Sequence, residues 1–142
     1  MEDASYTTFR SVIGVVAPLD PEGQQVKDVV RLALEENGFT AVPYDDAIPP
    51  GALRAASVFD AIRAANLVVG DVGRLDPNVL YELGFAGALR KPTIVLFSLK
   101  SGASLPSDLV GFHCTLYDPT NLGALADAIK ADTRAFLLRR SA

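Results

Sequence analysis

The sequence is poor in the residues that build disulfide frameworks and metal centres. Its 142 residues include one cysteine, Cys114, and one histidine, His113, directly before it. A single cysteine excludes an internal disulfide, and an isolated His–Cys pair lacks the spacing of a zinc site. Both residues fall in a strand-like run, FHCTLYD, so we interpret them as part of a strand. We therefore expect no metal site.

Excess basic charge and long apolar runs are also missing. Thirteen Lys and Arg residues against 17 Asp and Glu give a formal net charge of −4 and a pI near 4.9, whereas nucleic-acid binders usually carry a basic face. No apolar run approaches the roughly 18 residues of a membrane span, and the start, MEDASYTTFR, is unlike a signal peptide. We expect a cytoplasmic protein that binds neither nucleic acid nor membrane.

What is present suits one compact domain, since 49% of the residues are hydrophobic. We predict a flexible N-terminus over residues 1–10 and a single domain over 11–142. Short apolar, β-branched runs predict strands, and apolar residues at helical spacing predict helices. The predicted strands cover 11–18, 40–44, 66–72, 91–99 and 112–118. The predicted helices cover 20–39, 52–65, a segment beginning at 76, and 120–140.

Strands that alternate with helices indicate an α/β fold with a parallel sheet covered on both faces. We predict a three-layer flavodoxin-like or Rossmann-like domain whose five strands have the order 2-1-3-4-5. Ligands of such folds bind beyond the carboxyl ends of the strands, where the strand order reverses. The predicted crevice lies between the loop at 17–23, APLDPEG, and the loop at 70–78, GDVGRLDPN.

The segment DPNVLYELGFAGALRKP, residues 76–92, follows that second loop. Asp76 and Pro77 are typical of a helix start, and Glu82 is the one charged residue in the apolar stretch that follows. No cation stands within one helical turn of Glu82, so its carboxylate is either desolvated or faces a cleft, and desolvation raises a carboxyl pKa. We therefore consider Glu82 a catalytic candidate.

Two further carboxylates belong to the same region. Asp76 is either a helix cap or an acid at the crevice, and Asp71, at the end of a strand, either contacts a ligand or satisfies loop amides. We predict that Asp71, Asp76, Glu82 and the amide of Asn78 converge at the crevice. The candidates for substrate binding are Pro18, Leu19, Asp20, Asn66, Gly70, Asn78 and Tyr81.

Several common chemistries are excluded. The sequence has no GxxxxGK[ST] phosphate loop, and GDVG lacks the other glycines of a dinucleotide fingerprint, so no cofactor is expected. A phosphoacceptor receiver would need an acidic pair after the first strand and a lysine after the fifth, and neither is present. A Ser-His-Asp triad fails because His113 begins a strand and no nucleophile elbow is found.

The run NLVVGDVGRLDPNVLYELGFAGALRKPTIVL, residues 66–96, resembles the core motif of nucleoside 2-deoxyribosyltransferase-like proteins. That superfamily also includes nucleotide N-glycosidases and is related to TIR-like NAD-cleaving domains. The later LPSDLVGFHCTLYD, with Pro106, Asp108 and Tyr117, is similar to a segment of bacterial nucleotide-binding relatives. The resemblance covers roughly residues 11–118 and is strongest over 66–96.

The resemblance implies an enzyme that cleaves the N-glycosidic bond of a nucleoside, nucleotide or NAD-like molecule. It implies that Glu82, in YELG, is the nucleophile at the anomeric carbon and that Asp76 holds or protonates the leaving base. Asn66 stands where classical transferases often have an aspartate, which favours a hydrolase over base exchange. Family members often complete their sites across a homodimer, so we expect a homodimer or higher oligomer. A clean monomer by light scattering would contradict that expectation.

Two readings from other classes stay open. A nucleotide-sensing module of a defence or signalling system would bind a nucleotide at the same crevice and release no base. A pure interaction domain would use the small residues of the YELGFAGA helix to dimerise. Nucleotide binding without turnover would favour the first of these, and absence of nucleotide binding would favour the second.

Overall fold

The computed structural model describes residues 12–43, 54–73, 75–102, 104 and 112–141. At 12–13, 42–43, 54–55 and 137–141 only the backbone is described. The predicted flexible segment 1–10 lies outside these ranges. Within them no helix is long and apolar enough to cross a membrane.

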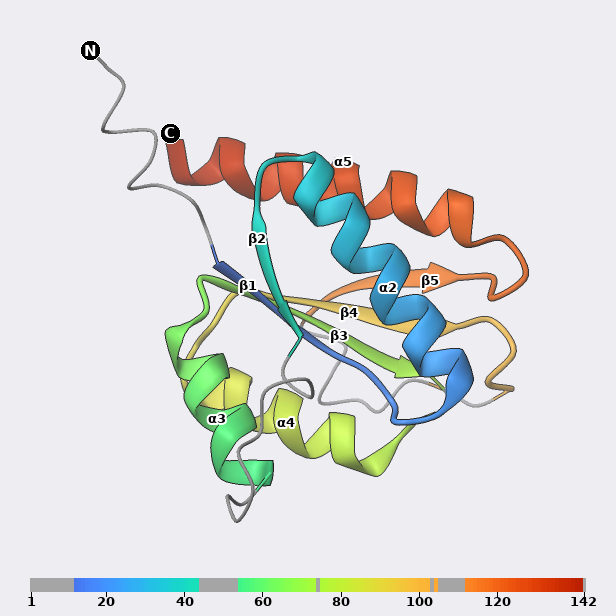
Figure 1. Ribbon diagram of the computed structural model, residues 1–142, viewed down its shortest axis with the longest axis horizontal. Helices are drawn as coiled ribbons and strands as arrows, with labels where there is room; N and C mark the ends of the chain where they lie inside the picture. Colours follow the sequence, from blue (N-terminus) through green and yellow to red (C-terminus); the bar gives the residue numbers. More distant parts are fainter. Residues whose placement is uncertain (1–11, 44–53, 74, 103, 105–111, 142) are drawn as a thin grey trace.

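The described chain alternates strands and helices (Figure 1). The strands are β1 (Val12–Val16), β2 (Thr40–Pro43), β3 (Leu67–Gly73), β4 (Thr93–Ser98) and β5 (His113–Tyr117). The helices are α2 (Pro21–Glu36), α3 (Arg54–Ala64), α4 (Pro77–Ala88) and α5 (Leu122–Ser141). Neighbouring strands pair in parallel, and the sheet has the order β2-β1-β3-β4-β5. β1 and β3 are therefore adjacent, and β2 lies at an edge.

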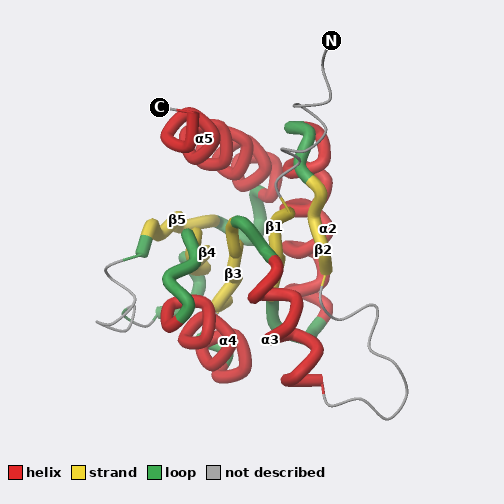
Figure 2. Tube along the Cα trace, turned by 90° about the vertical axis from the view of Figure 1, so that its left-hand side faces the viewer, coloured by secondary structure: helices red, strands yellow, loops and turns green. Residues whose placement is uncertain are grey.

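Helices cover both faces of the sheet. Figures 1 and 2 show α2 and α5 on one face and α3 and α4 on the other. Strand β3 is buried on both sides because its side chains alternate between the two layers. Leu67 and Val69 join the core under α2 and α5, whereas Val68 and Val72 join the core under α3 and α4. The α/β class with a covered parallel sheet is confirmed.

The carboxyl end of β3 is irregular. Its pairing with β4 shifts register between Asp71 and Gly73, so Asp71 pairs with Leu96 while Gly73 pairs with Phe97. Such bulges redirect side chains and often occur beside functional sites. Here the irregularity marks the point at which the chain leaves the sheet and turns towards α4.

Gly70 in β3 allows α4 to approach the sheet. A Cβ at this position would lie 2.5 Å from Cδ2 of Leu83, whose side chain is fully buried. We expect Gly70→Ala to lower the free energy of unfolding by about 1–3 kcal/mol, because an overpacked core must shift. Gly84→Ala is the control: Gly84 is exposed on α4, and a Cβ there would meet no other atom within 4 Å, so alanine should stabilise the helix by up to about 1 kcal/mol. Urea unfolding measures both, and equal effects would contradict this account of Gly70.

Candidate functional site

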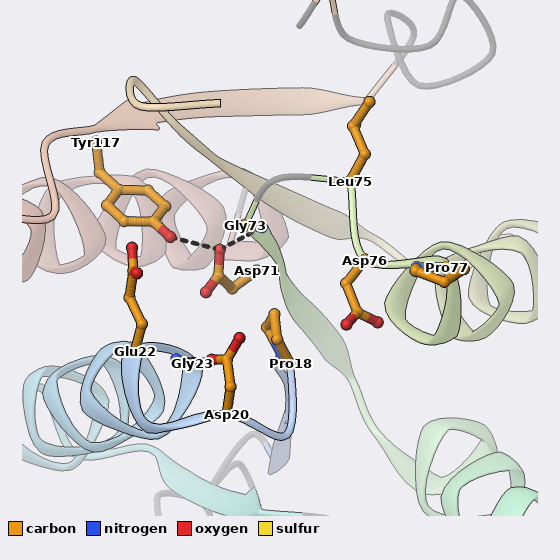
Figure 3. Close-up of a pocket in the computed structure, with 10 residues that line it drawn as sticks. All are labelled: Pro18, Asp20, Glu22, Gly23, Asp71, Gly73, Leu75, Asp76, Pro77 and Tyr117. Carbon is orange, nitrogen blue, oxygen red and sulfur yellow. Dashed lines mark hydrogen bonds between the residues drawn. The ribbon is translucent and has the colours of Figure 1, made fainter. Parts of the chain in front are cut away.

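A cavity of about 280 Å³ opens at the carboxyl ends of β1 and β3. It lies between the loop after β1 and the loop after β3, which is where the sequence predicts the crevice. Its lining residues are Pro18, Asp20, Glu22, Gly23, Asp71, Gly73, Leu75, Asp76, Pro77 and Tyr117 (Figure 3). Four of these ten residues are carboxylates, so the cavity offers hydrogen-bond acceptors to a ligand rich in donors.

Both helices that begin at the cavity start with the same Asp-Pro pair. Oδ1 of Asp20 caps α2 by accepting from the Gly23 N–H at 2.7 Å. Oδ1 of Asp76 caps α4 by accepting from the N–H groups of Asn78 and Val79 at 2.9 and 3.1 Å. Free N–H groups at a helix start commonly bind anions, but here the capping carboxylates already accept from one such group on α2 and from two on α4. The cavity is consequently acidic at both helix starts.

Close backbone contacts shape the cavity wall. A Cβ at Gly23 would lie 2.2 Å from the carbonyl oxygen of Pro18, so only glycine permits this approach of α2 to the loop after β1. Gly73 has φ +54° and also faces Pro18. Leu75 has φ +70°, which is unusual for a residue with a side chain. Backbone strain of this kind concentrates at functional sites.

Asp71 is the buried carboxyl group of the cavity, with 2% of its surface exposed. Its Oδ1 accepts a hydrogen bond from Oη of Tyr117 at 2.8 Å and another from the Gly73 N–H at 2.8 Å. Burial raises the pKa of Asp71 to about 6 and outweighs these two hydrogen bonds, which lower it. The negative charges of Asp20 and Glu22 raise the Asp71 pKa further. A large share of Asp71 thus carries a proton near pH 6.

Tyr117 lines the cavity, but it is missing from the candidate site residues that the sequence predicts. It ends β5 and is 4% exposed, and its phenol reaches across to Asp71. Burial and the charge of Asp71 raise the pKa of Tyr117, so the phenol stays protonated and donates. The available signal was its position, since it stands at the carboxyl end of a predicted strand within the segment that resembles nucleotide-binding relatives.

Four of the predicted site residues, Pro18, Asp20, Asp71 and Asp76, line the cavity together. Four others do not, because Leu19, Asn78 and Tyr81 are exposed outside it and Gly70 packs against Leu83. Asn66 precedes β3 and is thus about 16 Å from Asp71 along the strand, at the opposite end of the sheet. The structure does not bring these five residues to the cavity.

Glu82 occupies a different place from the one expected. It is 3% exposed on α4, next to Leu83, and it does not line the cavity. Helix α4 packs on the sheet face opposite α2 and α5, whereas Asp71 turns to Tyr117, which belongs to the α2 and α5 core. The predicted convergence therefore holds for Asp71 and Asp76 and not for Glu82. In the described part of the chain, no three His, Cys, Asp or Glu residues are arranged to hold a metal ion.

Comparison with known proteins gives fold-level similarity. No family model and no curated protein matches the chain. Among solved structures, it is similar to the CMP N-glycosidase BcmB of Clostridium botulinum, with 18% identity and a TM-score of 0.63 over 84% of this chain and 98% of that one. It is also similar to the 2-deoxyribosyltransferase of Bacillus psychrosaccharolyticus, with 17% identity and a TM-score of 0.60 over 79% of this chain and 90% of that one.

A third similar structure is the constitutive lysine decarboxylase of Escherichia coli, with 10% identity and a TM-score of 0.55. It matches 91% of this chain but only 18% of that one. Of these three structures, the N-glycosidase and the deoxyribosyltransferase match over most of both chains. At 17–18% identity these two matches show a shared fold, which is the fold that the resemblance of residues 66–96 implies.

Proposed function

We propose that this protein cleaves the N-glycosidic bond of a nucleoside, nucleotide or NAD-like molecule. The observation that carries the proposal is the acidic cavity beside β1 and β3, with buried Asp71 and helix-capping Asp76 in its wall. A fold shared with an N-glycosidase and a deoxyribosyltransferase supports it. Carboxylates suit this reaction because it passes through an oxocarbenium-like state and needs an acid for the departing base.

The proposed roles divide between the two sides of β3. The base of the substrate occupies the cavity, where Asp76 accepts hydrogen bonds from its donors. Glu82 is the proposed nucleophile, and it follows Asp76 on the same helix by six residues, about 9 Å along the axis. A sugar that extends from the cavity over the carboxyl end of β3 would approach α4. Because Glu82 is 3% exposed, sugar binding must uncover its carboxylate before it attacks.

We propose hydrolysis as the outcome, with water as the final acceptor of the sugar. Support comes from the resemblance alone, because Asn66 stands where classical transferases often have an aspartate but lies at the far end of β3 from the cavity. Base exchange would require a second base in the same cavity of about 280 Å³. Adding a second free base to the assay separates the two outcomes, since only a transferase would form a new nucleoside.

Release of free base tests the proposed activity. The purified protein is incubated with nucleosides, deoxynucleosides, their monophosphates and NAD, and the products are separated by chromatography. Glu82→Gln, purified identically, controls for nucleosidases of the expression host. Base release by the wild type alone would support N-glycosidic cleavage and identify the substrate class. If no compound loses its base, the proposal is wrong.

A non-catalytic nucleotide-sensing module is the second candidate. The observation in its favour is the placement of Glu82, which is buried on α4 and does not line the cavity. Such a module would bind one of the same compounds at the cavity without turnover. Calorimetric titration of compounds that lose no base distinguishes a sensing module from an unreactive protein.

A further inference from the structure

The two oxygens of the Asp71 carboxyl group have different surroundings. Oδ1 accepts from both Tyr117 Oη and Gly73 N–H, each at 2.8 Å. Figure 3 shows the other oxygen, Oδ2, turned towards the part of the cavity where Asp20 and Glu22 lie. Two donors occupy Oδ1, so a proton carried by Asp71 belongs on Oδ2. That oxygen is also the one that a ligand in the cavity can reach.

Three of the titratable side chains that line the cavity with Asp71 affect this proton in a definite direction. Asp20 and Glu22 at the start of α2 are negative and favour its retention, and Asp76 at the start of α4 is a further acid in the wall. Tyr117 of β5 acts in the opposite direction, because its hydrogen bond stabilises the charged carboxylate. Ser98 of β4 pairs with Tyr117 in the sheet, and its side chain lowers the pKa of Tyr117 against the larger effect of burial. Burial is the largest influence, and it favours the protonated form.

We infer that Asp71 is the acid that protonates the departing base, and that Tyr117 is a positioning residue that holds its carboxyl group with Oδ2 facing the cavity. This inference rests on the proposed function. As the bond between the anomeric carbon and the base nitrogen breaks, its electron pair goes to the base and the Oδ2 proton moves to the base. A Glu82 oxygen bonds to the anomeric carbon. Water then displaces Glu82, leaves its hydroxyl on the sugar and returns a proton to Asp71.

Burial distinguishes Asp71 from Asp76 in this role. Asp76 is partly exposed, and its Oδ1 fixes the first turn of α4 through two backbone N–H groups. Asp71 is 2% exposed, in surroundings that favour a neutral carboxyl group. A general acid must hold its proton near the working pH, and burial is the usual means of achieving this for a carboxyl group. Asp76 is then left to bind donors of the base.

Tyr117→Phe is the decisive variant, measured as the pH dependence of base release. An acid must be protonated, so release by the wild type should fall as the pH rises through the Asp71 pKa, near 6. Tyr117→Phe keeps the ring and removes the hydrogen bond that stabilises the carboxylate. The falling limb of the pH–rate profile, where base release declines as the pH rises, should therefore move about one unit to higher pH. Thr115→Val is the matched control: Thr115 precedes Tyr117 on β5 by two residues and its hydroxyl donates to Asp132 at 2.8 Å. It should leave the limb in place.

Carboxyl-carbon NMR titration of Asp71 in both proteins gives a second readout that does not depend on turnover. A lower maximal rate in Tyr117→Phe with an unmoved limb would show a merely structural role for Tyr117 and overturn the inference, while base release by the wild type would leave the proposed function standing. An Asp71 that titrates near the ordinary value of about 4 would also overturn it. If the wild type releases no base from any compound, the proposed function and this inference both fail.

Discussion

Replacement of Glu82 by glutamine is expected to reduce base release by at least about 10³-fold. An amide cannot form the ester with the anomeric carbon, and it provides no negative charge to stabilise the oxocarbenium-like state. Glutamine has nearly the same volume as glutamate, so the packing of a side chain that is 3% exposed should change little. Initial rates of base release, determined by chromatography at saturating substrate, measure the effect.

The control for Glu82→Gln is Glu35→Gln, the same change at an exposed position of the helix α2. It should leave the rate unchanged. Circular dichroism must show that Glu82→Gln is folded, because a loss through unfolding would say nothing about the nucleophile. A folded Glu82→Gln protein that retains the wild-type rate would remove Glu82 from the reaction and leave direct attack by water.

Much of the fold could be predicted because its signals are local. Buried strands such as β3 and β4 are continuous apolar runs, and the Asp-Pro pairs at 20–21 and 76–77 begin α2 and α4 as expected. The cavity followed from a general rule of parallel sheets, which places ligand sites beyond the carboxyl ends of adjacent strands. Asp71 and Asp76 stand at such positions in the sequence, and both line the cavity.

The remaining features of the site depend on relationships that a single sequence does not display. Tyr117 reaches Asp71 from a strand that ends 46 residues later, and the pairing of Ser98 with Tyr117 fixes its height in the sheet. Glu82 was expected at the crevice because it is the one charged residue in an apolar stretch of helix. A helix that is buried against the sheet has the same apolar composition, so this pattern does not distinguish the two placements. Gly70 was misassigned for a similar reason, since contact with Leu83 and contact with a ligand both require a glycine.

Strand direction alone explains the placement of Asn66. This residue precedes β3, and the cavity lies beyond the carboxyl end of that strand. A residue that opens a parallel strand is at the far edge of the sheet, about 3.3 Å further away for each intervening residue. Asn66 became a candidate through the resemblance to transferases. The parallel topology that predicts the crevice at the other end of β3 is inconsistent with substrate binding by Asn66 in that crevice.

Asp71→Asn is expected to stabilise the protein at alkaline pH and to leave its stability at acid pH nearly unchanged. Folding raises the Asp71 pKa from 3.8 to about 6, so between these values the folded state binds more protons than the unfolded state and stability falls as the pH rises. Above the folded pKa the full penalty of about 3 kcal/mol applies. Below pH 3.8 it is absent, because Asp71 is protonated in both states.

Asparagine removes this penalty and keeps a side-chain oxygen for the donors Tyr117 and Gly73. Urea unfolding should therefore show a gain of about 1–3 kcal/mol for Asp71→Asn at pH 8 and a gain of only about 0.5 kcal/mol at pH 4. Asp127→Asn, an exposed change on α5, should stay within about 0.5 kcal/mol of the wild type at either pH. An equal gain from Asp71→Asn at both pH values would contradict the titration argument. A variant that is more stable and releases no base would show that the protein retains a destabilising buried acid for its chemistry, since natural sequences give up stability chiefly where function requires it.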